Sequence, residues 1–142
     1  MNPSARFRRT EMLLGADGPL LECYERLGIL VRRQRLGGLA RPRTVPSAVD
    51  LVRWLRAAQI DVVHAHDVYS NAFTVPVARL AGGVGVVASR RWWHHAPRRS
   101  LVTVNRYAYR LAHRVVANSP AVARLLREED GVSEARVDVI PN

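Results

Sequence analysis

The sequence predicts an α/β fold in which a parallel sheet carries helices on both faces. Short runs of Val, Ile and Leu alternate along the chain with segments whose apolar residues recur at helical spacing. Continuous apolar strands are typical of parallel sheets, because neither face of a covered strand meets water. At 142 residues the chain is expected to form a single domain.

The expected elements follow one another as strand and helix along the chain. Six apolar runs are expected to form strands, at residues 11–14, 29–31, 61–66, 84–89, 115–117 and 136–140. Five helices are expected between them, at residues 20–27, 48–55, 71–81, 99–114 and 120–126. Ser47 and Ser119 are suited to cap the second and fifth helices, because a serine hydroxyl accepts hydrogen bonds from free amides at a helix start. Gly28 and Gly131 are placed to end helices.

The net charge of +10 is concentrated in one stretch of the chain. Residues 68–127 contain no Asp or Glu and ten arginines, whereas the other 12 arginines balance the 12 acidic residues of the chain. A surface built from this stretch is expected to attract phosphates, anionic lipid or nucleic acid.

The helix expected at residues 99–114 separates apolar from basic side chains. Its inner stripe is expected to consist of Val104, Tyr107, Ala108 and Leu111. On the opposite side lie Arg99, Arg106, Arg110 and His113. This basic side is either a solvated surface or one that docks on anionic lipid head groups.

Composition also limits the compartment in which the chain works. Cys23 is the only cysteine, which excludes an intrachain disulfide and favours the cytoplasm. No uncharged apolar stretch reaches the roughly 18–20 residues of a membrane-spanning helix. Residues 1–10 form a polar, Arg-rich lead with no apolar core after it, so a secretory signal is not expected. Residues 11–142 are expected to form the domain.

Polar residues gather where the expected strands end. In open parallel sheets, ligands bind outside the carboxyl ends of the strands, which directs attention to residues 15–19, 66–71, 89–99 and 118–119. His64 and His66 are two apart on a strand and therefore share a face. They either orient a substrate hydroxyl or a phosphate, or form a hydrogen-bonded pair packed under the next helix. A zinc site is disfavoured because no third Cys or His lies at ligand spacing, and no metal is expected.

Several of these polar residues have a purely structural alternative. Asp67, Ser70 and Asn71 lie near the start of a helix, where they either cap its free amides or help to hold a phosphate or carboxylate. Ser119 precedes Pro120, which is the residue order expected of a helix cap.

The densest candidate segment is Ser89 to Arg99, with the letters SRRWWHHAPRR. The guanidinium groups of Arg90 and Arg91 could bind phosphate in a bidentate manner. The tryptophans could stack on a sugar or lie at a lipid interface, or the segment is an exposed loop whose tryptophans pack onto the domain.

Four strings of the sequence resemble the N-terminal domain of glycosyltransferase family 4 enzymes, which have the GT-B architecture. These strings are residues 13–20 (LLGADGPL) followed by 28–29 (GI), residues 61–66 (DVVHAH), residues 115–119 (VVANS) and residues 137–142 (VDVIPN). They stand in the family's order at about its spacing and cover nearly all of the chain. The resemblance implies a Rossmann-like parallel sheet with helices on both faces, as an incomplete GT-B N-terminal domain.

The resemblance also implies an activity, namely transfer of a sugar from a nucleotide donor to an acceptor, with retention at the anomeric carbon. The N-terminal domain of such enzymes mainly binds the acceptor, which is here expected to contact His64, His66, Asp67, Arg90, Arg91 and Ser119. Asp17 and Gly18 are expected to contact the nucleotide-sugar co-substrate. No other cofactor is implied, and the C-terminal domain, absent from these residues, would hold most of the donor.

The partners that this activity implies are a glycan or lipid-linked acceptor of a cell-surface glycan pathway. The protein is then expected in the cytoplasm, or peripherally at the inner, anionic face of the membrane. The missing C-terminal domain is expected to be lost or encoded separately.

Two departures from the family pattern shape the expectations. The family's first strand should precede Glu11, and in the doubly wound order it would lie between the strands at Met12 and Val62. Loss of that strand leaves backbone groups unpaired, so the isolated chain is expected to be marginally folded and inactive. The second departure is Ser89-Arg90-Arg91 where many relatives have Thr-x-His, which favours substrate contact by Arg91 and leaves the catalytic residues unassigned.

Two other functions remain open from the sequence alone. The charge and the interleaved Trp and Arg residues are compatible with a nucleic-acid-binding module, although no recognisable nucleic-acid motif is present. The other is a remnant without activity of its own, from a truncated gene or a split enzyme.

Overall fold

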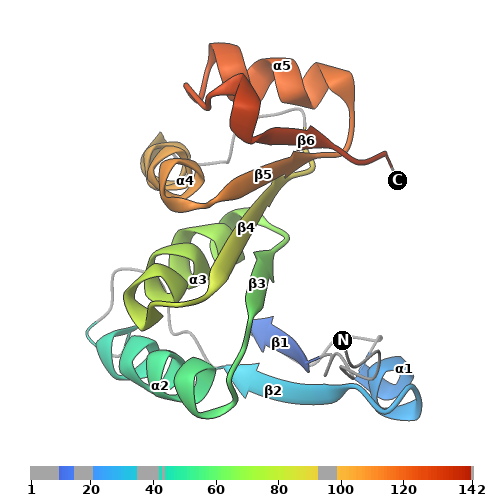
Figure 1. The fold of residues 1–142 in the computed structure, drawn as a ribbon, viewed down its shortest axis with the longest axis vertical. Helices are drawn as coiled ribbons and strands as arrows, with labels where there is room; N and C mark the ends of the chain where they lie inside the picture. The colour runs from blue at the N-terminus through green and yellow to red at the C-terminus, as the bar shows by residue number, and fades with distance from the viewer. Residues whose placement is uncertain (1–9, 15–20, 35–41, 43, 93–98, 142) are drawn as a thin grey trace, which may run out of the picture. The chain divides into compact units, whose positions relative to one another are not determined.

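The computed structural model describes residues 10–14, 21–34, 42, 44–92 and 99–141 (Figure 1). The chain divides into two compact units, Met1–Ser47 and Ala48–Asn142, and each is considered by itself. Asp17 and Gly18, most of the Arg-rich lead and residues 93–98 of the Trp- and His-containing segment lie outside the described residues.

The first unit contains a pair of parallel strands. Strand β1 (Thr10–Leu14) pairs with β2 (Leu30–Gln34), and helix α1 (Leu21–Arg26) precedes β2. Gly28 has a φ of 68°, which a glycine adopts without steric cost, and the Ile29 amide donates to the Tyr24 carbonyl oxygen at 2.9 Å. The predicted strands and the glycine that ends the helix are confirmed.

Helix α2 (Thr44–Ala57) begins four residues earlier than the sequence pattern predicts. Ser47 therefore lies inside the helix and is not its cap, and that prediction is wrong. The earlier start is compatible with Pro46, because the amides of a first helical turn have no partner within the helix and a proline there loses nothing.

The second unit is built on a four-stranded parallel sheet in the order β3-β4-β5-β6 (Figure 1). The strands are β3 (Val62–Ala65), β4 (Gly85–Arg90), β5 (Arg114–Ala117) and β6 (Val137–Val139). They alternate with α3 (Val68–Ala81), α4 (Arg99–Leu111) and α5 (Pro120–Glu128), and a short 3-10 turn, Glu134–Arg136, leads into β6. The predicted α/β fold, a parallel sheet flanked by helices, is confirmed, although the three helices that follow the strands of this unit lie on one face and not on both.

The strand register separates the side chains of this sheet into two faces. On one face, Val86, Ala88, Val115 and Ala117 are fully buried. Because the strands follow one another in chain order and such crossovers are right-handed, α3, α4 and α5 cover this same face. On the other face, Val87 and Val116 are only half-buried. We therefore call the first face the helix-covered face and the second the open face.

Helix α4 turns a different side inward than the apolar pattern predicts. Val104, Tyr107 and Leu111 are 40, 61 and 42% exposed, so their assignment to an inner stripe is wrong. The buried residues of α4 are Leu101, Asn105, Ala108 and Tyr109. Asn105 explains part of this choice, because its buried Nδ2 donates to the carbonyl oxygens of Val68 at 3.0 Å and Leu101 at 2.9 Å.

The chain forms two sheets within its described residues, and β3 pairs only with β4. No helix in the described part of the chain is long and apolar enough to cross a membrane.

Candidate functional site

Three loops of the second unit leave the sheet at the same edge. Because β3, β4 and β5 are parallel neighbours, the residues after their carboxyl ends lie side by side. We call this group the rim, and its described residues are His66, Asp67, Arg91, Trp92, Asn118 and Ser119. The Asn118 Nδ2 atom donates to the Arg91 carbonyl oxygen at 3.3 Å, which joins the second loop to the third.

Two histidines stand at the carboxyl end of β3 on the open face. The ring centroids of His64 and His66 are 4.0 Å apart, as expected for residues two apart on a strand. His64 Nε2 lies 2.7 Å from the hydroxyl oxygen of Ser89 on the neighbouring strand. Desolvation of the ring, helped by His66 and Arg91, lowers the pKa of His64 from 6.5 to about 4. His64 is therefore neutral at physiological pH, so one of its ring nitrogens can donate a hydrogen bond and the other can accept one.

Asp67 organises the start of α3. Its Oδ1 accepts hydrogen bonds from the amides of Tyr69 at 2.8 Å and Ser70 at 2.9 Å, while the Ser70 hydroxyl accepts from the Asp67 amide at 2.9 Å. This reciprocal capping explains why α3 begins at Val68 and not near residue 71. Asn71 is buried inside the helix, and its Nδ2 donates to the Ser89 carbonyl oxygen at 2.8 Å.

Ser119 caps α5, as predicted. Its hydroxyl accepts a hydrogen bond from the Val122 amide at 3.2 Å, and Pro120 follows in the first turn. The cap therefore places a serine oxygen at the rim, although one of its lone pairs is already used.

The two consecutive arginines that end β4 have opposite surroundings. Arg90 points to the helix-covered face, where it is 2% exposed and its Nη1 lies 2.5 Å from Oδ2 of Asp130. Its Nη2 lies 3.8 Å from a carboxylate oxygen of Glu129. Arg91 is exposed on the open face, and its charge reaches His64, where it contributes to the lowered pKa.

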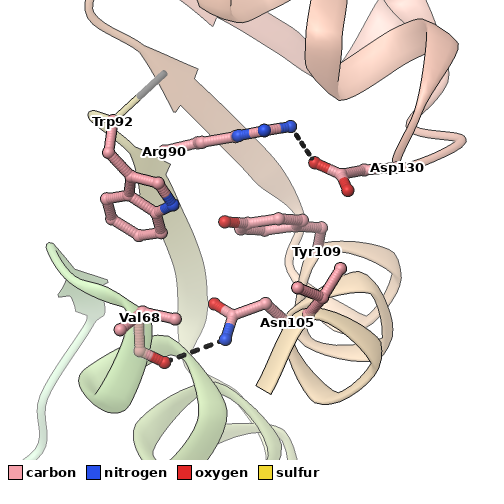
Figure 2. Close-up of a pocket in the computed structure, with 7 residues that line it drawn as sticks. Val68, Arg90, Trp92, Asn105, Tyr109 and Asp130 are labelled. Carbon is pink, nitrogen blue, oxygen red and sulfur yellow. Dashed lines mark hydrogen bonds and ion pairs between the residues drawn. The ribbon is translucent and has the colours of Figure 1, made fainter. Parts of the chain in front are cut away.

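A small cavity lies beneath the rim on the helix-covered face. Figure 2 shows Trp92 and Tyr109 entering it from two sides, with Arg90 and Asp130 above them and Asn105 below. Its volume of about 10 Å³ has room for about one water molecule and not for a sugar ring. Burial and the nearby Asp130 carboxylate raise the pKa of Tyr109, outweighing Arg90 and a hydrogen bond to Asn71, so its hydroxyl stays protonated.

The sequence patterns did not identify the residues that hold this cavity together, namely Asn105, Tyr109 and Asp130. A signal for Asp130 was present, because an arginine at the end of a buried strand needs an acidic partner. The acidic residues 128–130 are the first to follow the long acid-free stretch. Their pairing with Arg90, which is 40 residues away from Asp130 along the chain, follows only from the fold.

A larger hollow lies at the opposite edge of the same unit. It has a volume of about 250 Å³ and lies at the amino ends of β3 and β4. Asp61 and Gly83 line it together with Arg56, whose guanidinium donates to the carbonyl oxygens of Leu80 and Ala81. Of the predicted site residues that the structure describes, none lies there. Among the described residues, no group of three or more His, Cys, Asp or Glu side chains could hold a metal ion.

Solved glycosyltransferases of the GT-B architecture share the fold of this chain. A glycosyltransferase from Rickettsia africae ESF-5 superposes with a TM-score of 0.71 at 17% identity, over 94% of this chain and 35% of that one. Anabaena Alr3699/HepE, solved in complex with UDP and glucose, has a TM-score of 0.70 at 19% identity, over 92% of this chain and 36% of that one.

A third solved structure is the lipopolysaccharide outer core galactosyltransferase WaaB in its apo form. It has a TM-score of 0.60 at 17% identity, over 81% of this chain and 31% of that one. The chain thus spans about a third of the length of these structures, and identities this low show the fold alone. The search of curated proteins found no match.

The family follows from the sequence match. The model of glycosyltransferase family 4 matches residues 10–142, and the chain belongs to that family. The matched range contains every described strand and helix of both units.

Proposed function

We propose that this chain is the acceptor-side domain of a family 4 glycosyltransferase, which presents an acceptor hydroxyl at the rim to a nucleotide sugar held by another domain. The observation that carries the proposal is the family match over residues 10–142, combined with polar side chains at the carboxyl edge of the sheet. Ligands of open parallel sheets bind at that edge. The small cavity under the rim supports binding on the surface of the rim and not in a pocket.

The proposal gives the open-face residues direct contact with the acceptor. Neutral His64 and its neighbour His66, together with Asp67, bind hydroxyl groups, because imidazole nitrogens and a carboxylate offer acceptors at one place. Arg91 binds an anionic group of the acceptor, since a guanidinium matches a phosphate or carboxylate in a bidentate manner. Ser119 contributes a hydroxyl from the third loop.

Arg90 has a different part in this proposal. Its guanidinium is buried against Asp130, so it supports the loop that carries Arg91 from the opposite face. Asp17 and Gly18, which lie outside the described residues, remain the residues predicted to contact the nucleotide sugar.

The finer points of the proposal concern the pathway and the whole enzyme. The acceptor is a glycan or lipid-linked glycan of the cell surface, the transfer retains the anomeric configuration, and the enzyme works in the cytoplasm. The lone Cys23 and the basic acid-free stretch support this setting. These 142 residues alone do not transfer sugar, because the donor side of a GT-B enzyme belongs to its other domain.

The test begins with the DNA around the reading frame. A donor domain encoded in a continuing or adjacent frame is expressed with this chain, and transfer from a set of nucleotide sugars to membrane-extracted acceptors is measured. We expect transfer from the combined polypeptides and none from either part. Turnover by this chain alone, or a folded, nucleotide-binding donor domain that transfers no sugar with it, would refute the proposal.

A further inference from the structure

Helix α4 exposes an apolar stripe that no other described residue of its unit covers. The stripe consists of Val104, Tyr107 and Leu111, which lie on one side of the helix because they are spaced by three and four residues. Monomeric proteins expose single apolar side chains freely, but a row of three along one helix face marks a surface that meets something.

Arginines lie along one side of this stripe. Arg99, Arg106 and Arg110 are placed roughly a quarter of a turn around the helix from it. The Arg110 guanidinium carbon lies 6.0 Å from the centre of the Tyr107 ring, and Arg110 has no carboxylate partner among the described residues. The Nε atom of Arg106 lies 3.3 Å from Oδ1 of Asp130, but 41% of the Arg106 side chain is still exposed.

The neighbouring helix α3 adds a further arginine and a further exposed apolar residue. Arg79 near the end of α3 contacts the ring of His113, just after α4, so the two helices meet at their carboxyl ends. Leu80, beside that contact, is 72% exposed. Neither helix contains an acidic residue. We call the exposed set the α3–α4 outer surface, and it consists of Leu80, Val104, Tyr107 and Leu111 with Arg79, Arg99, Arg106 and Arg110.

We propose that the α3–α4 outer surface docks on an anionic lipid bilayer, with the apolar stripe at the acyl boundary and the arginines among the head-group phosphates. An apolar stripe beside arginines is the arrangement of helices that lie in the membrane interface. A second copy of the chain fits less well, because two surfaces with only positive charge repel each other. Nucleic acid fits less well, because a phosphate backbone offers no partner to the apolar stripe.

This inference does not depend on the proposed sugar transfer, because docking needs neither donor nor acceptor. The full chain is mixed with vesicles of pure phosphatidylcholine, or of equal parts phosphatidylcholine and phosphatidylglycerol, and the bound fraction is measured by sedimentation. We expect binding to the anionic vesicles only. Binding should weaken in high salt, since the Debye length falls from about 10 Å at 0.1 M to about 3 Å at 1 M.

Paired variants separate the outer surface from general charge. Arg110→Gln should lower the partition coefficient about fivefold, while Arg124→Gln, an exposed arginine on α5, should leave it within about twofold. The double variant Tyr107→Ser, Leu111→Ser should lower it about tenfold or more, and Ile140→Ser, which changes another exposed apolar residue, should not. Circular dichroism must show the same fold for all variants, which is expected because every substituted side chain is exposed.

Three results would overturn the inference. The first is an equal effect of the Arg110 and Arg124 substitutions, which indicates attraction by net charge alone. The second is a double variant that binds vesicles normally but dissociates a dimer in light-scattering measurements, which assigns the surface to a second copy. The third is binding of RNA that depends on Tyr107 and Leu111 while binding to anionic vesicles does not.

Discussion

Single residues of this protein take their roles from the alternation of strand side chains. Arg90 and Arg91 are neighbours in sequence, yet one is buried against Asp130 and the other is exposed near His64. Because successive side chains of a strand point to opposite faces, one arginine is available for structure and the other for a ligand. From the sequence alone, both arginines were predicted to contact the acceptor.

The buried ion pair gives the first prediction. Replacing Asp130 with Ala should lower the free energy of unfolding by about 3–5 kcal/mol, because Arg90 would be left charged and buried without its main partner. Urea unfolding followed by circular dichroism measures the change. A double variant, Arg90→Met with Asp130→Leu, should recover much of the loss, since an apolar pair of similar volume removes both buried charges. A loss under about 1 kcal/mol in the single variant contradicts this role.

The pKa of His64 gives the second prediction. A folded pKa of about 4 against 6.5 means that the unfolded chain binds more protons between these values, so stability falls as the pH is lowered from 6.5 to 4. Above pH 6.5 the ring is neutral in both states and contributes no pH dependence.

Other groups also titrate in this window, so the comparison is made with His64→Gln. Urea unfolding at several pH values should show a smaller loss of stability for this variant between pH 6.5 and 4 than for the wild-type chain. Parallel curves for the two proteins would show that His64 is as easily protonated in the folded chain as in the unfolded one.

At the scale of helices and strands, two residues that cap helices also lie at the rim. Asp67 and Ser119 each hold the first turn of a helix directly after a strand, through hydrogen bonds to backbone amides. The same oxygens that hold these helices therefore lie at the edge where the acceptor is proposed to bind.

The cap of α3 gives the third prediction. Asp67→Ala should lower the free energy of unfolding by about 1 kcal/mol, because the amides of Tyr69 and Ser70 lose their acceptor. Asp67→Asn should keep most of the stability, since an asparagine oxygen accepts the same bonds. Thermal unfolding of the three proteins measures the difference, and equal losses in both variants would mean that the negative charge, and not the cap, matters.

The elements show which parts of the structure a sequence can predict. Apolar runs were sufficient to locate the strands, because strands of parallel sheets are rich in Val, Ile and Leu, although β2 continues through Arg32, Arg33 and Gln34 beyond the predicted run. The inward side of α4 could not be predicted, because Asn105 and Tyr109 are buried by contacts with residues far away in sequence. The histidine pair and the caps at Asp67 and Ser119 depend on local sequence and were recognised, whereas the start of α2 and the role of Asp130 were not.

At the scale of the whole molecule, the proposed function gives the described chain one face of a reaction site. The parallel order of β3, β4 and β5 brings three polar loops to a single edge, and the family match extends over both units. The chain spans about a third of the solved GT-B structures. An acceptor bound at this edge would therefore meet a donor supplied from outside the residues described.

The most direct measurement is the steady-state kinetics of Arg91→Ala in an enzyme that combines this chain with its donor domain. We predict that the KM for the acceptor rises about tenfold, because a charge-assisted contact worth about 1.5 kcal/mol is lost, while the KM for the nucleotide sugar stays the same. Arg124→Ala, on the exposed side of α5, should change neither constant. A raised KM for the nucleotide sugar with an unchanged acceptor KM would contradict the acceptor-side assignment.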